Sequence, residues 1–291
     1  MRRVGNFFRG QARHSSGLYK VLSALGSVVF VVGCSINPNH SGFQDGFAVA
    51  APTSKGYSGN RPAITIDQPE NKTVIVYSHG TTNSQLAENC GAFWNDVPTS
   101  LIALQRPGRL IYFLCTNVVE STARSRAGEY VYLRLDEVEA TLDELIGVGV
   151  KPRSLFLAGH SAGGWVSLMA SSKFPQKFNA TIAFAPAFAG RRSNEKRFPY
   201  WRQEIRPRQI KDMLSATEIN ALVFAYEGDP FNRPEDLSFL TDRYPNSVEL
   251  IGYGCAIGNK HLVHLHDCRE AATTDAMARF IDARLREASD R

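Results

Sequence analysis

Short apolar runs recur along the chain from residue 73 onward, and helical patterns separate them. The runs are four or five residues long and rich in β-branched residues, and they lie at 73–77, 110–114, 155–158, 181–185, 221–225 and 248–251. Continuous apolar runs of this length are typical of strands that are covered on both faces, as in a parallel sheet. The pattern therefore predicts six strands of one mostly parallel sheet.

Two intervening stretches have clear helical periodicity. In residues 130–146 the apolar positions on one face are Val131, Leu135, Val138, Leu142, Leu145 and Ile146. In residues 271–285 they are Met277, Phe280, Ile281 and Leu285. Alternating strands and helices predict an α/β fold with a doubly wound sheet, whose ligand sites lie at the carboxyl ends of the strands.

The start of the chain has a different pattern. An apolar run at 21–32 follows a stretch whose only charges are Arg2, Arg3, Arg9, Arg13 and Lys20. The run is too short to span a membrane comfortably, and its basic flank is typical of a secretory signal. It ends in Val31-Val32-Gly33-Cys34, which resembles a bacterial lipobox. The alternative is an anchor helix with an incidental cysteine.

We therefore expect residues 1–33 to be a signal peptide and Cys34 to be lipidated, so that the protein is an exported lipoprotein on the periplasmic side of a membrane. Ser35 resembles the residue found in lipoproteins of the outer membrane. Residues 34–60 are rich in Gly, Ser, Pro and Asn and predict a flexible tether. Residues 61–291 then form one α/β domain.

The predicted removal of residues 1–33 changes the charge balance, and the predicted export changes how the cysteines are interpreted. The chain has 33 Lys and Arg against 28 Asp and Glu, but the signal holds five basic residues and no acidic ones, which leaves 28 of each. Nothing overall then argues for a nucleic-acid partner. Four further cysteines in an exported chain suggest disulfides, and we favour Cys90–Cys115 and Cys255–Cys268 over four buried thiols. Their spacing matches no metal site.

The predicted strand at 155–158 runs into Gly159-His160-Ser161-Ala162-Gly163, and a helical stretch follows. This Gly-x-Ser-x-Gly motif, between a strand and a helix, indicates a sharp turn that exposes one serine hydroxyl. The two glycines stand where the backbone has to pass close to its neighbours. Ser161 is the candidate nucleophile, and the turn directs the backbone N–H of Ala162 toward the group that Ser161 would attack.

Four motifs in order resemble the α/β-hydrolase family, across nearly all of 61–291: a His-Gly loop, Gly-x-Ser-x-Gly, an acid after a late strand, and a histidine before the last helix. The resemblance extends to small serine esterases of the dienelactone-hydrolase kind. It implies that Asp229, in the turn after 221–225, is the acid of a catalytic triad. Glu227 is the nearest rival, and Asp236 or Asp242 would have to reach back from the next helix.

The base of the triad is divided among three histidines before the final helix, His261, His264 and His266. We favour His261, because its Gly-x-x-His-apolar pattern looks like the family's histidine loop. A zinc site is the rival explanation of the cluster, but no further ligand pattern completes it. The resemblance also implies that the N–H groups of Thr81 and Ala162 form the oxyanion hole. His79 is interpreted as a structural partner of that loop, with a base role as the alternative.

A basic segment at 190–211 separates two of the predicted strands. We favour a solvated basic face. The alternative is a lid whose arginines bind anionic lipid head groups or an acidic substrate.

These features predict a serine hydrolase that cleaves a small-molecule carboxylic ester without a cofactor or a metal. A hydrolase fold that has lost catalysis and serves as a surface binding protein is the alternative of another class. Among enzymes the alternative is a peptidase of the prolyl-oligopeptidase kind, which usually carries a large extra domain.

Overall fold

The computed structural model describes residues 42–43, 64–81, 96–116, 130–188, 192–194, 196, 200–255, 260–265 and 269–289. The chain divides into two units, Met1–Cys34 and Ser35–Arg291, and every described residue belongs to the second. The predicted signal peptide, the lipidation site Cys34 and most of the 34–60 tether therefore lie outside the described residues. So do Cys90 and Cys268, one in each predicted disulfide, and both pairings stay predictions.

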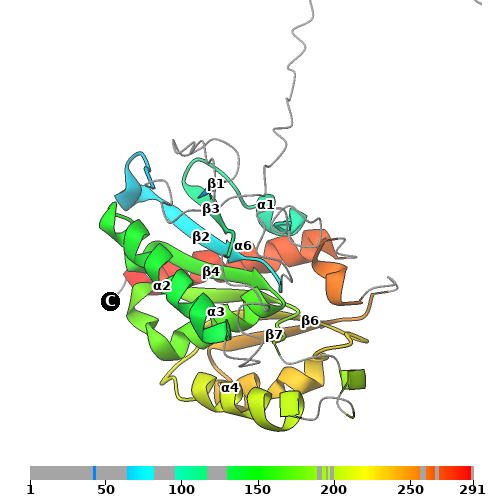
Figure 1. Cartoon of the computed structure of the whole chain (residues 1–291). Coiled ribbons are helices and arrows are strands. Elements are labelled where there is room, and N and C mark those ends of the chain that lie inside the picture. The colour runs from blue at the N-terminus through cyan, green and yellow to red at the C-terminus, as the bar shows by residue number, and fades with distance from the viewer. Residues whose placement is uncertain are drawn as a thin grey trace, which may run out of the picture. The chain divides into compact units, whose positions relative to one another are not determined.

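A seven-stranded sheet in the order β1-β3-β2-β4-β5-β6-β7 is the centre of the fold (Figure 1). Its strands are β1 (Gly42–Phe43), β2 (Thr73–Ser78), β3 (Arg109–Leu114), β4 (Leu155–His160), β5 (Ala180–Phe184), β6 (Ala221–Tyr226) and β7 (Val248–Tyr253). The strands from β2 to β7 pair in parallel, and only β1 is antiparallel to its neighbour β3. All six predicted strands are confirmed, as is the mostly parallel sheet.

Side chains of each strand alternate between two hydrophobic cores, one on each face of the sheet. In β4, Leu155 and Leu157 enter the first core, whereas Phe156 and Ala158 enter the second. The first core includes residues of α2 (Tyr130–Gly147), α3 (Ala162–Lys173), α4 (Arg206–Met213) and α5 (Ser238–Arg243). The second includes residues of α1 (Thr99–Ile102) and α6 (Glu270–Ser289). Because both faces are covered, the strands read as continuous apolar runs.

The two strongest helical patterns are also confirmed, as α2 and α6. Five of the six apolar positions predicted for α2 are buried, and Ile146 packs partly buried against the same core. Strand β1 is the described strand that the pattern misses, and it lies within the predicted tether. Its two residues carry no periodicity, and Phe43 is held by tertiary contact, its ring 5.1 Å from that of Tyr112.

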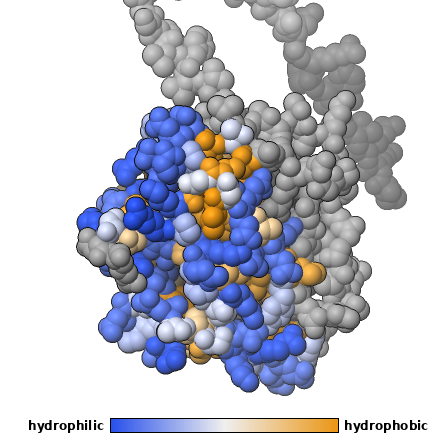
Figure 2. All heavy atoms as spheres, turned by 90° about the vertical axis from the view of Figure 1, so that its left-hand side faces the viewer, coloured by the Kyte–Doolittle hydropathy of each residue, from blue (hydrophilic) through white to orange (hydrophobic). Residues whose placement is uncertain are grey.

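The left-hand side of Figure 1 faces the viewer in Figure 2, and the described part of this face is mainly hydrophilic, with a hydrophobic strip that runs down its upper middle. Leu133 and Tyr200 are the large hydrophobic side chains that are exposed in the described residues. No described helix is both long enough and apolar enough to cross a membrane.

Candidate active site

Ser161 stands between the end of β4 and the start of α3, in a conformation that serine rarely adopts. Its φ is 52° and its ψ is −118°. Backbone hydrogen bonds hold it on both sides: its N–H donates to Phe184 at 2.9 Å, and its carbonyl accepts from Trp165 at 3.0 Å and from Ala187 at 3.1 Å. A strained residue persists only where its surroundings over-determine it, and such strain clusters at functional sites. The Gly-x-Ser-x-Gly turn is thus built as the motif requires.

Both glycines of the motif are required by close backbone approach. A Cβ on Gly163 would lie 1.9 Å from the carbonyl oxygen of Ser78, at the end of β2. A Cβ on Gly159 would lie 2.5 Å from the carbonyl carbon of Gly163. Only glycine therefore lets α3 begin directly against the ends of β4 and β2, as expected from the sequence.

The structure brings Ser161, His261 and Asp229 into one hydrogen-bonded chain. His261 Nε2 lies 2.8 Å from Ser161 Oγ, and His261 Nδ1 lies 2.8 Å from Asp229 Oδ2. Ser161 follows β4, Asp229 follows β6, and His261 lies in the 3-10 helix η10 (Lys260–Leu265) after β7. The carboxyl ends of three strands thus supply the three groups, as a parallel sheet allows.

Asp229 fixes the direction of this chain. Its side chain is fully buried, and its Oδ1 accepts from the backbone N–H groups of Phe231 at 2.6 Å and Asn232 at 3.3 Å. Since an ionised carboxylate only accepts, His261 Nδ1 carries the proton that it donates to Oδ2, and Nε2 accepts from the Ser161 hydroxyl. This is the tautomer in which a histidine can take a proton from serine.

Two more side chains hold His261 in place. His160, inside the Gly-x-Ser-x-Gly motif, is buried, and its Nε2 donates to the carbonyl oxygen of His261 at 2.8 Å. The ring of Phe231 lies 4.3 Å from the ring of His261, between centroids. The sequence analysis missed both residues. No local sequence pattern points to either role, because the partner His261 lies on another segment of the chain.

The His79-Gly80-Thr81 segment after β2 is fixed by a network of buried groups. His79 Nδ1 donates to the carbonyl of Gly80 at 2.8 Å, and its Nε2 accepts from the N–H of Thr116 at 3.2 Å. The buried Arg134 of α2 donates to the carbonyls of His79 at 2.7 Å and Gly80 at 3.3 Å. His79 is thus bonded to its own loop and to Thr116 after β3, as the structural interpretation expects. Arg134 was missed, although it is a charged residue on the apolar face of a predicted helix.

Two other groups belong to this region. Thr81 is half-buried, and Ala162 is fully buried at the first position of α3. Tyr77, the next-to-last residue of β2, donates its hydroxyl to the carbonyl of Asp96 at 3.2 Å. Burial, and next the negative charge of Asp96, raise the pKa of Tyr77 well above its usual range, so that its hydroxyl stays protonated.

The rival acids lie elsewhere. Glu227 and Asp242 are exposed, and Asp236 accepts from the N–H of Arg233 at 2.8 Å, at the start of the short helix η9 (Pro234–Leu237). The side chain of His264 and the whole of His266 lie outside the described residues. Within the described residues, no three His, Cys, Asp or Glu side chains come together as possible metal ligands.

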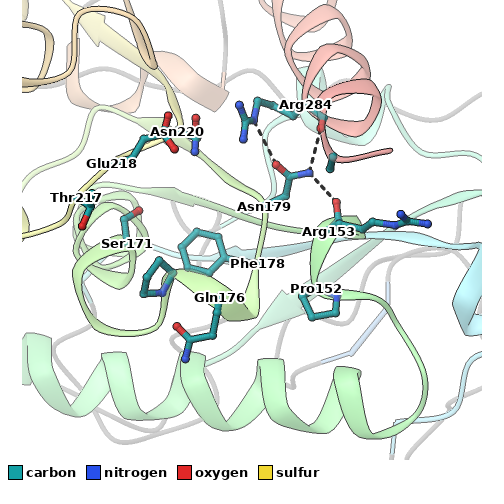
Figure 3. Close-up of a pocket in the computed structure, with 12 residues that line it drawn as sticks. Pro152, Arg153, Ser171, Gln176, Phe178, Asn179, Thr217, Glu218, Asn220 and Arg284 are labelled. Atoms are coloured by element: carbon teal, nitrogen blue, oxygen red, sulfur yellow. Dashed lines mark hydrogen bonds between the residues drawn. The ribbon is translucent and has the colours of Figure 1, made fainter. Parts of the chain in front are cut away.

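A cleft of about 510 Å³ lies at the opposite edge of the sheet (Figure 3). It is lined by residues that precede β4, β5 and β6, such as Arg153, Asn179 and Asn220, and by Arg284 of α6. Ser161 and Asp229 follow the far ends of β4 and β6. This cleft is therefore separate from the Ser161 region.

Comparisons with known proteins find similarity to hydrolases. Residues 118–222, about a third of the chain, match the model of the family described as "Putative esterase". No curated protein matches the sequence. The family match supports a serine hydrolase.

The fold is similar to several solved structures at low identity. A prolyl endopeptidase shares 12% identity with a TM-score of 0.54, over 75% of this chain and 35% of its own. A metagenome-derived lipolytic enzyme shares 13% with a TM-score of 0.53, over 73% of this chain and 95% of its own. Esterase 2 of Thermogutta terrifontis, phosphonylated by sarin, shares 14% identity with a TM-score of 0.50, over 73% of this chain and 84% of its own. The chain spans about a third of the endopeptidase but most of the other two. It therefore has the α/β-hydrolase fold.

Proposed function

We propose that this protein is a serine hydrolase that cleaves a small-molecule carboxylic ester through an acyl-serine intermediate, in the manner of small esterases of the dienelactone-hydrolase kind. The observation that carries the proposal is the hydrogen-bonded chain from Ser161 Oγ through His261 to the buried carboxylate of Asp229. Serine needs an adjacent base to act as a nucleophile near neutral pH, and His261 is that base here.

In the first half of the reaction, Ser161 Oγ attacks the ester carbonyl while His261 Nε2 takes the hydroxyl proton. The tetrahedral intermediate collapses when the alcohol leaves with that proton, and the acyl group stays on Ser161. In the second half, His261 takes a proton from water, which attacks the acyl-serine, and returns it to Ser161 as the acid is released. Asp229 keeps the proton of His261 on Nδ1 and stabilises the imidazolium that forms in each half.

The negative charge of the tetrahedral intermediate requires hydrogen-bond donors. We assign this role to the backbone N–H groups of Thr81 and Ala162. Ala162 is the first residue of α3, and the N–H groups at a helix start have no partner within the helix. The buried hydrogen bonds from Arg134 to His79 and Gly80 hold the backbone directly before Thr81, which supports a fixed position for its N–H.

A fluorophosphonate probe tests the proposal, because it forms a stable bond only with an activated serine. We expect wild-type protein to be labelled and to hydrolyse p-nitrophenyl esters, and Ser161→Ala to lose both while its melting temperature changes little. A matched panel of esters and amides separates an esterase from a peptidase. A folded wild-type protein that takes no label, and whose Ser161→Ala variant keeps its role in the cell, would instead be a binding protein.

We also propose that the mature chain begins at a lipidated Cys34 and is anchored to a membrane on the periplasmic side, with the outer membrane favoured by Ser35. The support is the Val31-Val32-Gly33-Cys34 pattern after a basic, apolar segment. Metabolic labelling with an alkyne fatty acid should tag the wild-type protein, and Cys34→Ser should abolish the tag. An untagged, soluble mature protein would contradict the anchor.

A further inference from the structure

Three arginines that follow β5 bind one loop. We call residues 229–236, which follow β6 and begin with the candidate acid, the acid loop. Arg192, in the short helix η7 (Arg192–Asn194), donates from Nη2 to the carbonyl of Asp229 at 2.7 Å. Arg202, in the π-helix η8 (Trp201–Ile205), donates to the carbonyl of Phe231 and, at 3.3 Å, to Asn232 Oδ1. Arg206, the first residue of α4, donates to the carbonyl of Asp236.

The acid loop touches the candidate base twice. Its first residue supplies the carboxylate that accepts from His261 Nδ1, and Phe231 supplies the ring that packs against the imidazole. The loop is anchored at one more point, where Asn232 Nδ2 donates to the carbonyl of Pro186 at 2.8 Å. Even a small shift of this loop would therefore move both the carboxylate of Asp229 and the Phe231 ring that packs against His261.

Arg206 also connects the loop to α3, the helix that follows the nucleophile. Its guanidinium lies 5.9 Å from the ring centroid of Trp165, in α3, and 5.8 Å from that of Phe239, in α5. Burial, and next the positive charge of Arg202, lower the pKa of Arg206 below its usual range. An arginine is kept in such surroundings where its planar fork has specific oxygens to bind.

These contacts differ from what the basic composition of 190–211 suggested. We predicted a solvated basic face, with binding of anionic head groups or an acidic substrate as the alternative. Arg208 and Lys211 of α4 are exposed and fit a solvated face. Arg192, Arg202 and Arg206 are half-buried, and each gives a guanidinium N–H to an oxygen of the acid loop.

We propose that Arg192, Arg202 and Arg206 are positioning residues that hold the acid loop so that Asp229 and His261 stay in hydrogen-bonding register with Ser161. The proposal rests on the proposed hydrolase function for its effect on rate, but its effect on the Asp229–His261 hydrogen bond is independent of that function. Arg202 is the central member, because its fork bridges the backbone of Phe231 and the side chain of Asn232.

The test compares Arg202→Met and Arg202→Lys with the control Lys211→Met, which removes an exposed charge from α4. One readout needs no activity: the proton that His261 Nδ1 donates to Asp229 gives a downfield NMR signal, assigned by its loss in His261→Ala. We expect Arg202→Met to lose or broaden this signal while circular dichroism shows a folded protein. The control should keep the signal.

The second readout is the kinetics of ester hydrolysis. We expect Arg202→Met to lower kcat by about 100-fold, which is the scale of a small misplacement of catalytic groups, with KM changed less than about 2-fold. Arg202→Lys should lie between wild type and Arg202→Met, because an ammonium keeps the charge but not the two-pronged geometry. Lys211→Met should match wild type.

Two results would overturn the proposal. The first is an Arg202→Met variant with an unchanged NMR signal and unchanged kcat. The second is a raised KM for anionic esters at unchanged kcat, restored by Arg202→Lys, because the arginine would then bind substrate through its charge. If wild-type protein hydrolyses no ester, the proposed function fails, and the NMR signal in Arg202→Met still decides for or against the positioning role.

Discussion

Ser161 keeps a backbone conformation that an L-residue avoids, because its neighbours leave no other path for the chain. Non-glycine residues in such regions cost about 1–3 kcal/mol each. Here the cost is met by three backbone hydrogen bonds to Ser161 and by the contact of Gly163 with the end of β2. The result is that the serine hydroxyl makes no cap to its own helix and instead faces His261.

Gly163→Ala should therefore disrupt the molecule at this turn. The added Cβ would meet the Ser78 carbonyl oxygen at 1.9 Å, so that β2 and α3 would have to separate. We expect a loss of more than about 4 kcal/mol in the free energy of unfolding, seen as low solubility or a much lower melting temperature. Gly147→Ala, at the end of α2, is the matched control, since nothing lies within 4 Å of its Cβ. A Gly163→Ala variant that melts like wild type would contradict this reading of the turn.

The choice among the three histidines can be tested residue by residue. His261 lies 2.8 Å from both Ser161 and Asp229, so we expect His261→Ala to lower kcat by about 10⁴-fold or more, as Ser161→Ala does. His264→Ala should lower kcat far less, through packing alone. The measurement is kcat with a p-nitrophenyl ester on folded variants. If His264→Ala matches Ser161→Ala while His261→Ala remains active, the base is His264.

At the scale of elements, polar side chains of α2 tie this helix to a loop and to another helix. Arg134 of α2 reaches the loop after β2, and Tyr132, also of α2, donates its hydroxyl to Asp212 of α4 at 2.5 Å. Burial, and next this hydrogen bond, raise the pKa of Tyr132 to about 12. Contacts of this kind join segments that are far apart in the sequence, so no local pattern predicts them.

The Tyr132 contact predicts a stability that depends on pH. The pKa of Tyr132 in the folded protein is raised above its ordinary value of 10.0. The contribution of the Tyr132 hydrogen bond to the free energy of unfolding is therefore complete below pH 10 and is lost as pH rises through 12. Tyr132→Phe should lower the free energy of unfolding by about 1 kcal/mol at pH 8, and the difference from wild type should shrink toward pH 12. Urea unfolding at a series of pH values measures it. Tyr200→Phe, at an exposed tyrosine, is the control, and a difference that does not change with pH would contradict the assignment.

For the whole molecule, the sequence predicts most of what the two-sided sheet requires. Six strands and the helices α2 and α6 follow from apolar periodicity, because each element buries a full face. The order Ser161, Asp229, His261 could be proposed because it resembles the motif order of the α/β-hydrolase family, and each residue follows a predicted strand. Strand β1 could not be predicted, since two residues have no period. The roles of His160 and of the three arginines could not either, because their partners lie on other segments.

The two edges of the sheet provide a last prediction. The candidate triad lies beyond the carboxyl ends of the strands, whereas the cleft of about 510 Å³ lies before their amino ends (Figure 3). A six-residue strand such as β4 separates the edges by about 20 Å. Thr217→Trp, which places an indole at the rim of the cleft, should therefore leave kcat/KM for a p-nitrophenyl ester within about 2-fold of wild type. Thr217→Ser is the control for loss of the native side chain. A large fall in kcat with Thr217→Trp, in a protein that melts like wild type, would mean that the cleft and the Ser161 site are coupled through the sheet.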